Sequence, residues 1–138
     1  MKNLLLAVVL LGAGLIAQTA MASPACPSTD FATFVSAYSE SQALQRTFVR
    51  LPLQTLLTVN AEPEPQQQRR KLSAGQLTFP LMPDAASRQA KGLVLRVTQP
   101  VEGKGVVVLE KPDTDYQVEY RFVFDQCWVL RERLDYSL

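Results

Sequence analysis

The sequence contains no histidine and only two cysteines, and these shortages exclude most familiar catalytic and metal sites. Without histidine there is no Ser-His-Asp or Cys-His catalytic set, and no imidazole is present to bind a metal. The glycine-rich loops that hold nucleotide phosphates are also missing. The sequence therefore predicts a protein with no catalytic residues, no cofactor and no metal.

Net charge is also small. Lysine and arginine total 14, and aspartate and glutamate total 13, for a formal charge of +1. A chain so close to neutral lacks the basic field with which nucleic-acid-binding proteins follow phosphates. We therefore expect no nucleic acid among the partners of this protein.

The N-terminus has the three parts of a secretory signal. Lys2 precedes an apolar run over residues 4–17, and Ala20-Met21-Ala22 supplies a small-x-small cleavage pattern. The run is shorter than the roughly 20 residues that span a bilayer. Cleavage near Ala22 predicts a periplasmic protein without stable membrane insertion. It would also remove Lys2 and leave 13 basic against 13 acidic residues, a formal charge of zero.

Residues 23–138 have the length of one domain, since domains cluster around roughly 100–150 residues. Cys26 and Cys127 lie near the two ends of this domain. Two thiols in an oxidising compartment most often form a disulfide. A redox or nucleophilic thiol needs a Cys-x-x-Cys pair or an activating base, and neither is present. We expect one disulfide that ties the N-terminal helix to the last strand.

Hydrophobic periodicity predicts helices first and strands afterwards. Phe31, Phe34, Val35 and Tyr38 are spaced as on one face of a helix, behind N-cap residues at 28–30. A capping-box pattern over residues 39–42 indicates a second short helix that ends near residue 46. Strands are expected at residues 47–60, 76–81, 93–98, 106–110, 116–124 and 128–136, with a short helix possible within 82–91.

These elements predict an α+β fold, in which the amphipathic helix and a short second helix pack on a curved, mostly antiparallel sheet of five or six strands. Pro52 lies within the first expected strand and cannot donate a hydrogen bond to a neighbour. That strand must therefore be bulged at Pro52 or lie at an edge of the sheet.

Residues 60–71 predict a solvated loop, because they contain two prolines and three glutamines and change from acidic to basic. A loop of this length is often functional, and its prolines limit the entropy lost on binding. Arg69, Arg70 and Lys71 are therefore candidate partner-binding residues. The alternative is a solvated loop without such a role.

The last two strands supply the other candidates. A three-residue loop between them aligns the apolar residues of both strands and pairs Phe124 with Trp128. This register puts Arg121 opposite Arg131, which is unfavourable unless acidic groups lie nearby, such as the carboxylates of a partner. It also puts Glu132 on the apolar face, where a carboxylate needs a cationic neighbour. These three charged residues are further partner-binding candidates, and a structural ion pair is the alternative for Glu132.

Both ends of the sequence resemble a pattern in small exported bacterial proteins, over Asp30–Gln45, Val49–Leu53, Trp128–Leu130 and Asp135–Ser137. In that pattern an aromatic-spaced helix leads through an apolar-Gln step into a strand that ends in aromatic-Pro-Leu, and this sequence has Leu51 in place of the aromatic residue. The group is similar to the cystatin-like, nuclear-transport-factor-like α+β cone, in which helices pack into a curved sheet. The resemblance implies this fold and carries no enzymatic motif.

Two functions fit these observations. The first is a non-enzymatic periplasmic binding protein, most concretely an immunity protein that inhibits a secreted envelope- or cell-wall-degrading effector by covering its active site. The alternative is a carrier of a small apolar ligand, held between the helix and the aromatic strand at 116–124. A hydrolase that relies on Glu132 alone would lack the partner groups of acid–base catalysis.

Overall fold

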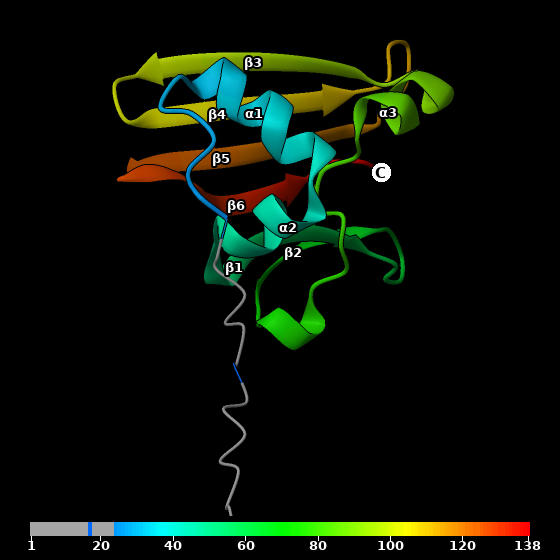
Figure 1. Cartoon of the computed structure of the whole chain (residues 1–138). Helices are drawn as coiled ribbons and strands as arrows, with labels where there is room; N and C mark the ends of the chain where they lie inside the picture. The colour runs from blue at the N-terminus through cyan, green and yellow to red at the C-terminus, as the bar shows by residue number, and fades with distance from the viewer. Residues whose placement is uncertain (1–16, 18–23) are drawn as a thin grey trace, which may run out of the picture.

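Three helices and a six-stranded sheet form the described part of the chain, which in this computed structural model comprises residue 17 and residues 24–138 (Figure 1). The predicted signal at residues 1–22 lies outside the described residues except for Ala17. The helices are α1 (Phe31–Glu40), α2 (Gln42–Thr47) and α3 (Ala85–Lys91), and the strands are β1 (Val49–Val59), β2 (Gln66–Leu72), β3 (Val94–Val101), β4 (Lys104–Glu110), β5 (Gln117–Asp125) and β6 (Cys127–Asp135).

Helix α1 begins where the N-cap pattern predicts. The Asp30 carboxylate accepts a hydrogen bond from the backbone N–H of Thr33 at 2.9 Å and satisfies a donor that the helix leaves free. The apolar face is fully buried, and the rings of Phe34 and Tyr38 lie 5.8 and 5.3 Å from the ring of Phe122 on β5. The predicted aromatic face of the helix therefore packs on the sheet.

Helix α2 is also confirmed, and its N-cap is Ser41, within the capping-box pattern over residues 39–42 and not at its first residue. The Ser41 hydroxyl accepts from the backbone N–H of Leu44 at 3.2 Å. None of the helices in the described part of the chain is both long enough and apolar enough to cross a membrane.

The sheet order is β2-β1-β6-β5-β4-β3, and the α+β class is confirmed. Strands β1 and β6 run parallel, and the other neighbouring pairs are antiparallel. Strand β1 lies between β2 and β6, but its ladder with β2 begins at Leu53, so Pro52 has no partner residue on β2. The register between β1 and β6 also shifts between Val49 and Gln54, so Pro52 lies in a bulge at the end of β1 that β2 leaves uncovered.

Two expected elements are wrong. Residues 66–71, predicted as the second half of a loop, belong to β2, whose register with β1 runs without interruption from Leu53↔Leu72 to Val59↔Gln66. Residues 76–81, predicted as a strand, continue from a short 3₁₀ turn, η1 (Ala74–Gln76), into an irregular segment that leads toward α3. Strand β2 escapes a pattern-based prediction because most of it is exposed, so it shows no apolar alternation.

The predicted disulfide joins Cys26 to Cys127, with 5.7 Å between the two Cα atoms. It ties the segment before α1 to the start of β6. Close by, the Trp128 indole N–H donates to the carbonyl of Thr29 at 2.8 Å. Gly105 on β4 lies under the ring of Phe31, where a Cβ atom would come within 2.2 Å of a ring carbon. The N-terminal helix is thus held close against the sheet at this end.

A buried amide joins the helices to the irregular segment before α3. The side chain of Gln45 is fully buried, and its Nε2 donates to the carbonyls of Tyr38 and Met82 at 3.1 and 2.9 Å. Its Oε1 accepts from the backbone N–H groups of Leu81 and Met82 at 2.6 and 3.1 Å. This one side chain therefore satisfies backbone groups of Leu81 and Met82, which lie outside every helix and strand.

We expect the substitution Gln45→Ala to lower the free energy of unfolding by about 3 kcal/mol, because it leaves several buried backbone groups without a partner. Gln42→Ala is the matched control, since Gln42 is exposed on the same helix and its loss should leave stability nearly unchanged. Urea denaturation followed by circular dichroism measures both. Equal stabilities for the two variants would contradict the structural role of this amide.

Candidate functional site

A β-bulge in β6 decides which residues reach each face of the sheet. Phe122 pairs with Leu130, as predicted, but the next pair along the strands is Arg121 with Glu132. Arg131 is the extra residue and is exposed. Since side chains alternate along a strand, every β6 residue beyond the bulge points to the opposite face from the one predicted.

The predicted pairing of Arg121 with Arg131 and the predicted place of Glu132 on the apolar face are therefore wrong. Glu132 lies on the outer face of the sheet, which we define as the face turned away from α1 and α2. There Arg121 donates to Glu132 at 3.1 Å and to Glu119 at 2.6 Å. The hydrogen bond with Glu119, assisted by Glu132, raises the pKa of Arg121. Its charge is neutralised within its own sheet.

The same shift turns Arg133 to the inner face, the face that packs against α1 and α2. Arg133 pairs with Thr55 on β1 and with Tyr120 on β5. Its guanidinium lies 5.8 Å from the centroid of the Tyr120 ring and 3.9 Å from the Asp135 carboxylate. Only about a quarter of the side chain is exposed. A half-buried arginine on an apolar face is an unusual placement.

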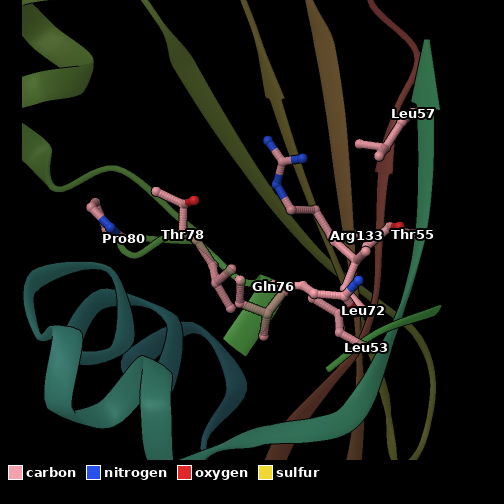
Figure 2. Close-up of a pocket in the computed structure, with 10 residues that line it drawn as sticks. Leu53, Thr55, Leu57, Leu72, Gln76, Thr78, Pro80 and Arg133 are labelled. Atoms are coloured by element: carbon pink, nitrogen blue, oxygen red, sulfur yellow. The ribbon is translucent and has the colours of Figure 1, made fainter. Parts of the chain in front are cut away.

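Arg133 opens into a cleft of about 330 Å³ between strands β1 and β6 and the segment after η1. Figure 2 shows its side chain lying between Thr55 and Leu57 of β1 and Thr78 and Pro80 of that segment. The remaining lining residues are Leu53, Leu72, Gln76, Leu77 and Leu81. The cleft therefore has apolar walls, a few hydroxyl and amide groups, and one cation.

Tyr120 anchors one wall of this cleft. Its hydroxyl donates to the carbonyl of Leu81 at 2.9 Å. Burial raises the pKa of Tyr120 to about 12, although the nearby Arg133 opposes that rise. Tyr120 therefore remains protonated at neutral pH and remains a donor.

Tyr38 is the second buried tyrosine. Its hydroxyl has no hydrogen-bond partner within the described residues. Burial raises its pKa well above the ordinary range, and the neighbouring Tyr120 adds to that rise. In residues 17 and 24–138 no group of three or more histidine, cysteine, aspartate or glutamate side chains is arranged to hold a metal.

The two buried tyrosines predict loss of stability in alkali. Their pKa values in the folded state lie above the ordinary value of 10.0, so the stability linked to them is present in full below pH 10 and is lost as the pH rises further. In an ultraviolet tyrosinate titration, we expect Tyr38 and Tyr120 to ionise only as the protein unfolds by circular dichroism. Ionisation of Tyr38 and Tyr120 near pH 10 with the fold intact would contradict this burial.

The other candidates from the sequence lie on the edge and on the outer face. Arg69 and Lys71 are on the outer face of β2, and Arg70 is on its inner face, as their pairing with β1 requires. Arg131 borders a hollow of about 300 Å³ on the outer face together with Arg121 and Glu132. The structure thus places Arg121 and Glu132 in contact, but it leaves the three cations of β2 apart from them.

Arg133 was not predicted, although the sequence carries a signal for it. Three consecutive charged residues at 131–133 lie between Leu130 and Leu134, and no regular alternation places all three in solvent. A bulge resolves the conflict, and it moves Leu134 to the outer face. There Leu134 is 1% exposed and pairs with Leu56, which is 7% exposed.

No protein-family model matches the sequence, and no curated protein matches it. By its structure, the chain has an NTF2-like α+β fold, which confirms the resemblance inferred from the sequence. It is similar to the crystal structure of an NTF2-like protein from Bacteroides fragilis, with a TM-score of 0.57 and 16% identity. The similarity covers 79% of this chain and 47% of that chain, so this chain spans about half its length.

Proposed function

We propose that the protein is a non-enzymatic binding protein, exported to the periplasm, whose cleft at Arg133 holds a small ligand with a carboxylate and an apolar tail. The observation that carries this proposal is the bulge at Arg131, which turns Arg133 out of solvent and into a leucine-lined cleft. Bulges frequently occur beside functional sites, where they redirect a side chain.

The charge of Arg133 is suited to binding a carboxylate. A guanidinium presents a planar set of donors that matches a carboxylate, and partial burial strengthens the attraction. The nearest carboxylate of the chain, that of Asp135, lies at 3.9 Å, which is beyond hydrogen-bond distance. Asp135 thus forms an ion pair with Arg133 without accepting a hydrogen bond from it, and the N–H donors of Arg133 can still bind a ligand.

The walls favour an apolar tail of modest length. Five leucines line the cleft, and covering them contributes roughly 25 cal/mol for each Å² removed from water. The volume of about 330 Å³ is at the lower end for ligand pockets, which run from roughly 300 to 1,000 Å³. A medium-chain fatty acid has the chemistry and the size that this cleft favours.

The absence of catalysis is part of the proposal. The chain has no histidine, and both cysteines are held in the disulfide. Glu119 and Glu132 are hydrogen-bonded to Arg121 on the outer face, away from the cleft. These residues offer no acid–base pair to a molecule bound at Arg133.

We expect decanoate to bind the purified protein and Arg133→Gln to weaken that binding by roughly 10-fold to 100-fold, the usual effect of losing a charge-assisted hydrogen bond. Arg131→Gln is the matched control, because Arg131 is two residues away and exposed. Isothermal titration calorimetry measures both, and decanol tests the need for the carboxylate. Equal affinities for the two variants, or equal affinities for the acid and the alcohol, would contradict this role for Arg133.

A second candidate function is an immunity-type inhibitor of a secreted envelope- or cell-wall-degrading hydrolase. The observation that favours it is the hollow on the outer face, where Arg131 and Lys104 are exposed. In the described part of the chain, neither cation has a carboxylate within salt-bridge distance. Such a surface is complementary to the acidic active-site cleft of a hydrolase.

This candidate predicts that affinity purification from the native envelope recovers one hydrolase in stoichiometric amount. The double variant Lys104→Glu/Arg131→Glu should reduce its recovery, because charge reversal opposes an acidic surface. Arg133→Gln should leave recovery unchanged, since that residue lies on the inner face. Recovery of no hydrolase would refute the inhibitor function without affecting the ligand cleft.

A further inference from the structure

Strand β2 is an open edge of the sheet. It pairs with β1 on one side and has no neighbouring strand on the other in the described part of the chain (Figure 1). Residues 66–71 are all exposed. On the open side of such a strand, backbone N–H and C=O groups point outward and are ready to pair with another strand.

This edge lacks the usual backbone obstacles to pairing. The opposite edge of the sheet, β3, contains Pro100 and a shift of register between Thr98 and Val101. Strand β2 contains no proline, and its register with β1 is unbroken over its whole length. The positive charges of β2 are therefore its one defence against pairing with another strand, and they favour a strand of opposite charge.

The charges of β2 all have one sign. Arg69, Arg70 and Lys71 pair across the ladder with Leu56, Thr55 and Gln54, none of which is charged. Among the described residues, no carboxylate lies within salt-bridge distance of these three cations. The nearest acid in the same row is Glu132 on β6, beyond Gln54, and Arg121 already holds it.

A second copy of the chain is a poor occupant, because pairing two β2 edges would bring six of these cations together. An acidic strand removes that repulsion. Arg69 and Lys71 are two residues apart on the outer face, so carboxylates at alternate positions of an added strand would reach both. A hollow of about 200 Å³ lined by these residues, with Gln54 and Thr55, gives room for such side chains.

We propose that β2 binds an extended acidic segment of a partner protein, which adds to the sheet as a seventh strand next to β2. Backbone hydrogen bonds hold the segment, and its alternate glutamate or aspartate side chains contact Arg69 and Lys71. The proposal does not depend on the cleft at Arg133, which opens on the inner face between β1 and β6.

The test uses a short fluorescent peptide of alternating glutamate and valine, and its binding is measured by fluorescence anisotropy. We expect binding that weakens with salt and that falls roughly tenfold in the double variant Arg69→Gln/Lys71→Gln. Lys91→Gln/Lys111→Gln is the matched control, because it removes two exposed cations elsewhere and should bind as the unaltered protein does.

A second peptide separates strand addition from simple charge attraction. It carries the same glutamates but has proline in place of valine, so it cannot donate backbone hydrogen bonds at those positions. We expect the proline peptide to bind roughly tenfold more weakly than the valine peptide. The valine peptide should slow the backbone hydrogen exchange of residues 66–72, and the proline peptide should leave that exchange unchanged. Equal binding of the two peptides, or tighter binding of an oligonucleotide than of the valine peptide, would overturn the proposal.

Discussion

The buried amide of Gln45 is the interaction on which the rest of this structure depends. The segment between β2 and α3 has little regular structure, so it lacks the repeated hydrogen bonds of a helix or a ladder. Gln45 supplies them at Leu81 and Met82 and joins the same segment to the end of α1. The hydroxyl of Tyr120 adds one more bond at Leu81. Because that segment forms one wall of the cleft, the shape of the cleft depends on an amide that does not itself line it.

Much of the fold follows from local sequence patterns. Helix α1 and strand β5 each bury one face and expose the other, so their periods of 3.6 and 2 are visible in the sequence. The disulfide follows from the number of cysteines and the expected compartment. The register next to the β5–β6 turn follows from matching Phe124 with Trp128. For α1, β5 and the β5–β6 turn, the deciding contact lies within the element or across one short turn, and the disulfide needs only a count of cysteines because the chain has two.

The features that escaped prediction depend on distant parts of the chain. Strand β2 has no buried face of its own, so only its pairing with β1 makes it a strand. The bulge at Arg131 depends on Leu134 packing beside Leu56 and on Arg121 reaching Glu132, and these contacts join three strands. A hairpin considered alone favours the unbulged register, because it contains no β1. The candidate site was missed for that reason, since Arg133 reaches the inner face only through the bulge.

The parallel pairing of β1 with β6 has a consequence for how the protein folds during its synthesis. Strand β1 lies near the start of the described residues and β6 near their end, and among these residues β6 alone joins the β2–β1 pair to the rest of the sheet. Contacts so distant in sequence form late, because the chain between them must first be ordered. The two halves of the sheet therefore remain separate until the last strand has been synthesised. A nascent chain stalled before β6 has neither the cleft nor the disulfide.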